Sequence, residues 1–372
     1  MDFELSDERR MLAETAERYL ADQYPMARRH KAAAEPSGFD ADAWAEMAEL
    51  GLVAALLPPE AGGLGGMGED LLVVFERLGR AAVVEPFLAQ LLGATALQAV
   101  DADTDWEAVA EGRLRLAFAH TEPGTRFESA HVATRAVPTE TGWRLTGRKT
   151  VVLNGDSADR ILVSARIGGD DTDADGIGLF LVDGTNLERR GYGTVEGGQA
   201  ADLTLADTAA QALGAPGEAL PAIEATLARG ALAVSAEALG LMEVCKDTTL
   251  DYLKTRSQFG RPIGAFQALQ HRMVDMLLEI EQARSAVMLA AGLADSPSPE
   301  ATRALHAAKH LVGRTGRLVA EEAIQLHGGI AMTWEYDLPH YAKRLVMIDH
   351  LFGDTDHHLE RFIAMAGAEG VT

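Results

Sequence analysis

The feature that most constrains the fold is a double change of hydrophobic period along the 372-residue chain. From residue 1 to about 112, apolar side chains recur three and four positions apart, which is typical of amphipathic helices. From about 113 to 216, short runs rich in β-branched residues are bounded by Gly, Asn and Asp, which predicts strands joined by turns. After about residue 217 the helical spacing returns. The order is therefore helices, strands, helices.

This order predicts an α+β multidomain protein. We expect an N-terminal α-helical domain over 1–112, a compact central β domain over 113–216 and a C-terminal helix bundle over 217–372. No fixed-period repeat argues for a solenoid. One helix start is marked in detail, because Ser298 is suited to an N-cap and Pro299 to the first helical position.

Charge and cysteine content narrow the function classes. The formal charge of −23 opposes binding to nucleic acid or to anionic membranes, and no run of Lys and Arg offsets it. The single cysteine, Cys245, excludes an internal disulfide and is expected to be a small buried hydrophobe. The first twenty residues have acids where a signal peptide has bases, and no apolar run approaches the roughly 20 residues that span a bilayer. We expect a cytoplasmic protein without membrane contact.

Two polar clusters each allow more than one interpretation. The acidic insert at 168–176, GGDDTDADG, is most simply a solvated hairpin loop, although a calcium loop is an alternative. The stretch LFGDTDHHLERF at 351–362 packs Asp354, Asp356, His357 and His358 into five positions. It could be a metal site, an acid–base site or a helix start. Two or three ligands on one helix face leave a metal incomplete, so capping by Asp354 is favoured.

Two helix breaks have the chemistry of ligand-binding turns. At 255–272 the chain turns through Gly260 and Pro262, which leaves Arg256 and Gln267 beside free backbone donors suited to a phosphate. Taken alone, this segment is more simply explained as a tight interhelical turn with ordinary surface polar residues.

The second break, QLHGGIAM at 325–332, follows a long helix with two glycines, where a C-cap requires only one. In the β region, the turn at 118–124 offers Thr121 and Glu122, each a weak signal by itself.

Taken together, these segments resemble the acyl-CoA dehydrogenase family over essentially the whole chain. The matching motifs are MAELGLVAALLPPEAGGLGG, HTEPG, LTGRKTVVLNGDSADRILVSAR, TRSQFGRPIGAFQALQHRMVDM and AIQLHGGIAMTWEYDLPHYAKRL. The resemblance implies a central β-barrel-like domain, a C-terminal four-helix bundle and FAD bound between subunits. It also implies abstraction of an α-proton from an acyl-CoA thioester, usually by a Glu, with transfer of the β-hydride to the flavin.

The resemblance also assigns cofactor-binding residues. Two elements match those that reach across to the ADP part of a neighbouring subunit's FAD, while Thr355 matches a further FAD contact and Thr121 lies in a turn near the pyrophosphate. The two reaching elements are Arg256, Phe259 and Gln267, and Gln325, Gly328 and Gly329.

The catalytic base is where this chain departs from the family. The usual Glu is replaced by Gly353, and Asp354 lies one residue further along as a doubtful substitute catalytic residue. Some family members place the Glu on an earlier helix, but here that position falls near Gly230. Glu237 lies two turns further on, where a helix–helix hydrogen bond is as good an explanation as catalysis.

Positions that flank the flavin also differ. Val151 and Leu153 stand where the family usually has a Trp beside the isoalloxazine and a Thr near its reactive nitrogen. Arg126 and Phe127 replace a Gly-Ser pair near the pyrophosphate. Features that serve a neighbour's FAD are thus intact, whereas features that hold and use a FAD within the same subunit are eroded.

This asymmetry resembles the small, base-lacking subunits of heteromeric bacterial acyl-CoA dehydrogenases of the steroid side-chain or pimeloyl-CoA type. The leading hypothesis is a subunit that pairs with a homologous Glu-bearing chain, in a tetramer that takes an acyl-CoA and passes electrons to an electron-transfer flavoprotein or another acceptor. The alternatives are a homo-oligomeric enzyme that uses Asp354 or Glu237 as base, and a catalytically silent scaffold.

Overall fold

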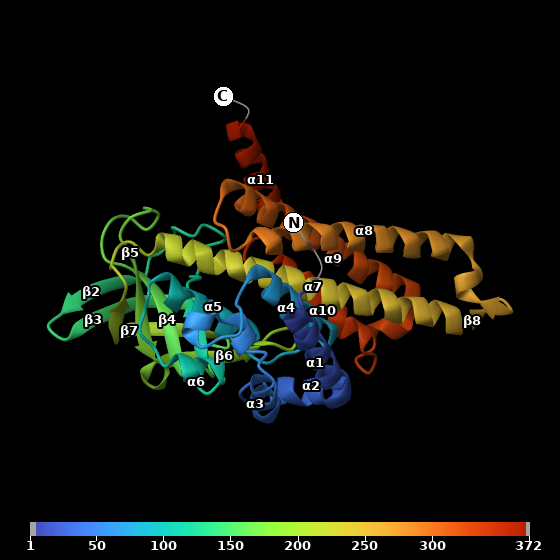
Figure 1. Ribbon diagram of the computed structural model, residues 1–372, viewed down its shortest axis with the longest axis horizontal. Coiled ribbons are helices and arrows are strands. Elements are labelled where there is room, and N and C mark those ends of the chain that lie inside the picture. Colours follow the sequence, from blue (N-terminus) through green and yellow to red (C-terminus); the bar gives the residue numbers. More distant parts are fainter. Residues whose placement is uncertain (1–4, 370–372) are drawn as a thin grey trace. The chain divides into compact units, whose positions relative to one another are not determined.

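The computed structural model describes residues 5–369, and the chain divides into two compact units (Figure 1). We call the first the bundle unit, because it contains most of the long helices, and the second the barrel unit. The bundle unit comprises Met1–Arg29, Met67–Val83 and Ala231–Thr372; the barrel unit comprises His30–Gly66 and Val84–Gly230.

The bundle unit is built from long helices joined by short turns. The predicted cap is confirmed, since the Ser298 hydroxyl accepts the N–H of Ala301 and Pro299 opens the helix. The helices are α1 (Asp7–Gln23), α4 (Gly68–Arg80), α7 (Leu220–Thr255, which begins in the barrel unit), α8 (Gln267–Leu293), α9 (Pro299–His327), α10 (Leu338–Asp349) and α11 (Thr355–Glu369), with short 3-10 turns η4 (Ile263–Ala265) and η5 (Gly328–Met332).

Helix α7 is the central helix of the bundle unit, and glycine allows α4 to approach it closely. A Cβ added at Gly240 would lie 2.0 Å from the Glu76 carbonyl oxygen, and one at Gly79 would lie 2.1 Å from that of Glu237. Cys245 is fully buried here, as expected, and burial raises the pKa of its thiol to about 12. By length and composition α7 alone among the described helices could cross a membrane, contrary to expectation, but 78% of its most apolar stretch is buried inside the protein.

The barrel unit closes a sheet on itself, as the family resemblance implies. Strand β4 pairs with β1, β2 and β5, while β5 pairs with β7, so the path β4-β2-β3-β7-β5 returns to β4. The strands are β1 (Leu116–Ala119), β2 (Arg135–Thr139), β3 (Gly142–Leu153), β4 (Arg160–Arg166), β5 (Ile177–Asp183), β6 (Glu188–Gly193) and β7 (Gln199–Leu213). The predicted runs of β-branched residues correspond to β3, β4 and β5.

The closed sheet encloses an apolar core, and helices of the same unit cover part of it. Helix α5 packs against β1. The core residues include Leu145, Val163, Phe180 and Leu203, all fully buried. The helical elements of the barrel unit are α2 (Met26–Ala34, shared with the bundle unit), α3 (Ala41–Glu49), α5 (Phe87–Ala99), α6 (Trp106–Ala110), η1 (Ala54–Leu56), η2 (Pro59–Ala61) and η3 (Gly184–Asn186). Helices, then strands, then helices is therefore the observed order.

The acidic insert at 168–176 is the hairpin loop between β4 and β5, as predicted. Its backbone carbonyls do not face an open cation site. The fully buried Arg166 guanidinium donates hydrogen bonds to the carbonyl oxygens of Asp171, Asp173 and Asp175 at 3.2, 2.9 and 2.7 Å. These three carbonyl oxygens are thus already bound by an arginine of the protein.

Candidate functional site

The turn between α7 and α8 presents its side chains to solvent. A two-residue hairpin of β8 (Ser257–Gln258) and β9 (Arg261–Pro262) follows α7, and its tip carries Phe259 at φ +53° and 90% exposed. Phe259 contacts Phe266 edge to face, with ring centroids 6.2 Å apart. Both aromatic rings therefore lie outside the hydrophobic core.

Donors for an anion lie in the same turn. Arg256 is exposed, and its guanidinium makes no hydrogen bond or ion pair among residues 5–369. Gln267 is the first residue of α8, and the N-cap residue Phe266 provides no side-chain cap, so the dipole and the first N–H groups of α8 remain available. A cation, an aromatic face and backbone donors are the chemistry that an adenosine diphosphate requires.

The end of α9 forms a second open element. Gly328 has φ +68° and closes the helix by donating its N–H to Ile324, which explains the first glycine. A Cβ added at Gly328 or Gly329 would meet nothing within 4 Å, so the backbone is open to close approach. Gln325 is also exposed. The two open elements lie at the same end of the bundle, because Tyr252 near the end of α7 stacks on His327 of α9 with ring centroids 4.3 Å apart.

The loop between α10 and α11 has the opposite character. Gly353, at the usual position of the base, is buried with φ +108°. Its carbonyl oxygen accepts a hydrogen bond from Lys309 Nζ at 2.8 Å, and the Phe352 carbonyl accepts one from His358 Nε2 at 3.0 Å. Sequence reasoning did not identify Lys309, although its place beside Ala308 on the buried face of α9 is a detectable signal.

Asp354 is used as a helix cap. Its carboxylate accepts the N–H of His357 at 2.8 Å, in the manner favoured for the start of α11. Thr355, the FAD contact by resemblance, donates both its N–H and its hydroxyl to Asp349, at 3.0 and 2.7 Å. Gly313 of α9 makes room for this pair, since a Cβ there would lie 2.1 Å from the Asp349 carboxylate. The cap explains Asp354 without catalysis.

Glu237 is held in an ion pair between helices. Its two carboxylate oxygens accept from Nε and Nη2 of Arg344 at 2.6 and 2.7 Å, and its side chain is only 7% exposed. Both oxygens of the Glu237 carboxylate are therefore engaged by Arg344. Gly230, the other position at which the family places a base, lies within the continuous helix α7 and is buried.

In the barrel unit, the turn after β1 is organised by a buried ion pair. Glu122 accepts a hydrogen bond from Lys149 Nζ at 2.6 Å, and further bonds from the N–H groups of Ala133 and Thr134. Burial alone would raise the pKa of the Glu122 carboxyl, but the charge of Lys149 holds it below its usual value. Thr121, next to this pair, is exposed and accepts the N–H of Thr150 at its carbonyl.

The same ion pair extends to a serine and a histidine. Lys149 also donates to Ser164 Oγ at 2.9 Å, and Ser164 lies 2.9 Å from His120 Nδ1. Burial lowers the pKa of Lys149 to about 8 and that of His120 to about 3, so His120 is neutral in the folded protein. This network joins β1, β3 and β4 and is a structural element of the barrel.

The expected flavin-flanking residues lie at a bulge of β3. The β3–β7 register shifts between Lys149 and Val152, and Val151 between them has φ +52° and is 49% exposed. A left-handed conformation is strained for a β-branched residue. Val151 and the half-buried Leu153 offer no polar side-chain atom. Nearby in the chain, Arg126 is exposed with its guanidinium 5.2 Å from the Phe127 ring.

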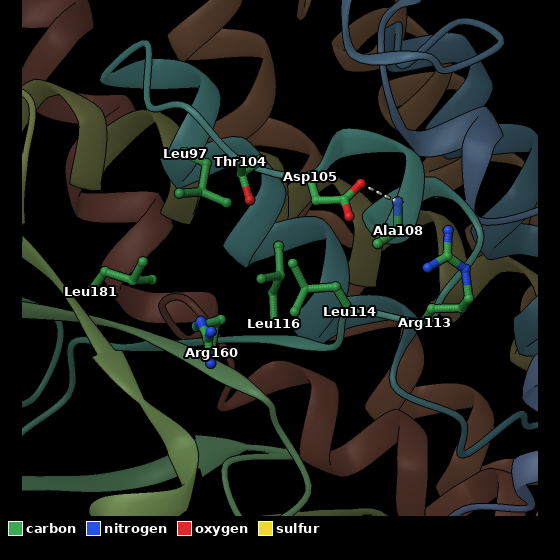
Figure 2. Close-up of a pocket in the computed structure, with 9 residues that line it drawn as sticks. All are labelled: Leu97, Thr104, Asp105, Ala108, Arg113, Leu114, Leu116, Arg160 and Leu181. Carbon is green, nitrogen blue, oxygen red and sulfur yellow. Dashed lines mark hydrogen bonds between the residues drawn. The ribbon is translucent and has the colours of Figure 1, made fainter.

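A separate pocket of about 370 Å³ lies elsewhere in the barrel unit (Figure 2). None of the residues singled out above lines it. Asp105 at its rim is already used, because its carboxylate caps α6 by accepting the N–H of Ala108 at 2.9 Å. Its lining is Leu97, Thr104, Asp105, Ala108, Arg113, Leu114, Leu116, Arg160 and Leu181. Within residues 5–369, no group of three or more His, Cys, Asp or Glu side chains is arranged to hold a metal.

Comparison with known proteins identifies the family. The chain matches the N-terminal domain of acyl-CoA dehydrogenases over residues 6–100, the middle domain over 117–205 and the C-terminal domain over 217–366. It therefore belongs to the acyl-CoA dehydrogenase family, whose members are oxidoreductases that act on acyl-CoA with FAD as cofactor.

Comparison with individual proteins shows how similar this chain is to particular relatives and solved structures. The chain is 32% identical over 365 residues to acyl-CoA dehydrogenase IpdE2 of Mycolicibacterium smegmatis, covering 97% of this chain and 99% of that one. A solved variant of the steroid ACAD Tcur3481-Tcur3483 is 31% identical with a TM-score of 0.86, covering 98% and 99%. The FAD complex of PigA, 24% identical with a TM-score of 0.89 and full coverage of both chains, shares the fold.

The chain fits one half of FAD better than the other. Arg256, the uncapped start of α8 and the open Gly328–Gly329 backbone suit the diphosphate and adenosine. The strained, apolar Val151 offers nothing polar to an isoalloxazine. The side-chain environments of these two regions therefore differ in their polar groups.

Proposed function

We propose that this chain is the base-lacking subunit of a heteromeric, FAD-dependent acyl-CoA dehydrogenase, paired with a homologous chain that carries the catalytic Glu. The observation that carries the proposal is the contrast between the open turn at Arg256 and Phe259 and the closed loop at Gly353. A chain that keeps exposed cofactor-binding groups but no available base is suited to complete another chain's site.

In this proposal the open turn binds the adenosine diphosphate of a FAD held mainly by the partner. The Arg256 guanidinium pairs with the diphosphate, the α8 start and the Gly328–Gly329 backbone donate hydrogen bonds, and Phe259 covers an apolar face. Gln267 and Gln325 supply amide donors. Within the described residues, these groups are used internally only in the contact of Phe259 with Phe266 and in the hydrogen bond from the Gly328 N–H to the Ile324 carbonyl oxygen.

The reaction class is α,β-dehydrogenation of an acyl-CoA thioester. Bound FAD supplies a two-electron acceptor for the β-hydride, while the α-proton goes to a carboxylate base. In this chain neither Asp354, which caps α11, nor Glu237, which pairs with Arg344, is free for that task. The partner's Glu therefore takes the proton.

Exposed apolar side chains on α8 support assembly with another chain. Helix α8 exposes Val274, Leu277 and Leu278, at 52, 40 and 56%, with helical spacing along one face. We infer a cytoplasmic heterotetramer that transfers electrons to an electron-transfer flavoprotein or another acceptor. The similarity to the steroid ACAD Tcur3481-Tcur3483 supports a steroid acyl-CoA as substrate.

The test is flavin content per chain, read from visible absorbance. The protein is purified alone and after co-expression with a Glu-bearing homologue. We expect a nearly colourless protein alone, and FAD together with turnover in the complex. Near-stoichiometric FAD and turnover in the chain alone would overturn the proposal in favour of a homo-oligomeric enzyme, which Asp354→Asn and Glu237→Gln would then dissect. Absence of FAD with every Glu-bearing homologue would favour a scaffold.

A further inference from the structure

Gly353 stands where the family usually has the catalytic Glu, and the residues around it leave no space for a side chain there. We infer that Lys309 and His358 are positioning residues that lock residues 349–355 into a closed loop, so that the backbone itself prevents a base at position 353. This deepens the proposed function, and rests on it in one respect: the base that the reaction needs must then come from the other chain.

Glycine is required at position 353 for two independent reasons. Its φ of +108° is a conformation that side-chain-bearing residues rarely adopt. A Cβ built there would lie 2.5 Å from His358 Nε2 and 2.7 Å from His357 Cδ2. Any larger side chain, including Glu, would have to displace both rings and change the loop backbone.

Lys309 anchors the loop from the opposite side. The side chain is fully buried, and its ammonium donates to the carbonyl oxygens of Ile348, Asp349 and Gly353 at 3.0, 3.3 and 2.8 Å. All three N–H bonds of the ammonium are therefore used, and each goes to the end of α10 or to the loop that follows it. A single lysine thus joins α9 to both ends of the turn.

His358 completes the lock through a defined tautomer. Its Nε2 lies 3.0 Å from the Phe352 carbonyl oxygen, which can only accept, so Nε2 carries the proton. Nδ1 of the neutral ring is then an acceptor, and His306 Nδ1–H donates to it at 2.8 Å. Phe352 itself has φ +57°, a strained conformation for a non-glycine residue that persists only where neighbours fix it.

The first test measures how much the closed loop contributes to the thermal stability of this chain alone, without FAD or partner. Gly353→Ala should lower Tm by at least about 4 °C. The matched control is Gly316→Ala, a buried glycine of α9 where an added Cβ makes only ordinary contacts at 3.5 Å, and its Tm should not fall. Equal effects of the two substitutions would overturn the inference.

The second test asks whether the hydrogen bond of His358 matters beyond packing. His358→Gln keeps a donor for the Phe352 carbonyl, whereas His358→Leu keeps only volume. By hydrogen exchange and mass spectrometry, amides of residues 350–355 should exchange faster in the Leu variant, with protection largely restored in the Gln variant. Equal protection in both variants would overturn the role of the ring.

The third test links the lock to catalysis. In the complex, the partner's Glu is replaced by Gln, and Gly353→Glu is introduced into this chain. We expect no recovery of turnover. Recovered turnover would overturn the inference and leave the heteromer intact, whereas FAD and turnover in this chain alone would instead overturn the proposed function, so the two failures are distinguishable.

Discussion

The open turn of residues 256–267 and the closed loop of residues 349–355 belong to the same bundle unit, yet they treat polar groups in opposite ways. The open turn leaves Arg256 without a described partner and Phe259 90% exposed. In the closed loop the polar groups are hydrogen-bonded within the protein, and the Lys309 ammonium donates to three backbone carbonyl oxygens. Exposed donors are accessible to a ligand, whereas buried polar groups whose hydrogen bonds are all made within the protein serve its structure.

The comparison also separates two ways of losing a function. A catalytic residue can vanish while its surroundings stay ready to receive it again, or the surroundings can be rebuilt around its absence. The surroundings of position 353 fit the second case, because the rings of His357 and His358 occupy the space of a side chain and Lys309 binds the backbone. Predictions that weaken one region and spare the other therefore test this interpretation.

Acid should affect the closed loop most strongly. Burial, with the nearby Lys309, lowers the pKa of His358 to about 3, whereas an unfolded histidine titrates near 6.5. Below pH 6.5 the unfolded chain binds the extra proton, so His358 alone makes stability fall by about 1.4 kcal/mol per pH unit as pH drops toward 3, and the buried His120 adds its own contribution. Urea midpoints from pH 7.5 to 4.5 measure this. In His358→Gln the slope should be shallower by one proton, and an unchanged slope would contradict a buried neutral ring.

Replacing Lys309 by Met should cost about 3 kcal/mol of unfolding free energy, because three buried carbonyls lose their donor. The exposed Lys254→Met in the last turn of α7 is the control, with an expected change below about 0.5 kcal/mol. Urea denaturation of both variants makes the measurement. A Lys309 variant as stable as the control would mean that the loop does not depend on its anchor.

The sequence was informative about the open turn because its signals are local. Arg256, Phe259 and Gln267 lie within twelve residues around Gly260, and their exposure follows from a helix break. The strands at 142–153, 160–166 and 177–183 are equally local patterns of β-branched residues. The absence of a base at Gly353 was also readable from a short motif.

The closed loop could not be read in the same way. Its bonds join Lys309 to Gly353 and His306 to His358, over 44 and 52 residues. No local periodicity encodes which carbonyl a buried lysine will reach, since that depends on how α9, α10 and α11 pack. The Glu122–Lys149 pair of the barrel unit was missed for the same reason. The sequence identified the missing base but not the network that replaced it.

Arg256→Ala should act on the open turn without touching the fold. Stability should change by less than about 0.5 kcal/mol, because an exposed side chain without a described partner is removed. FAD binding to the complex should weaken by about 10- to 100-fold, the value of a charge-assisted contact to a diphosphate. Fluorescence titration of the apo complex measures it, with the exposed Arg317→Ala as control. Unchanged FAD affinity would remove the open turn from the cofactor site.

The smallest expected effect on stability comes from relieving backbone strain. One strained residue lies in the open turn and another lies in the β3 bulge. Val151 and Phe259 both have left-handed backbones, at φ +52° and +53°, and both are exposed. Replacing either by Gly should relieve strain and stabilise the protein by about 0.5–1 kcal/mol, whereas Val137→Gly, at an exposed strand position of ordinary backbone, should destabilise it.

The two relieved variants should then diverge in the complex. Phe259→Gly removes an aromatic surface that we assign to the cofactor, so FAD retention should fall despite the gain in stability. Val151→Gly removes a side chain that already lacks the aromatic and polar groups a flavin would need, so FAD retention should stay unchanged. Equal losses in both would show that the β3 bulge still contributes to the flavin site, and the division between an intact and an eroded half would then have to be drawn elsewhere.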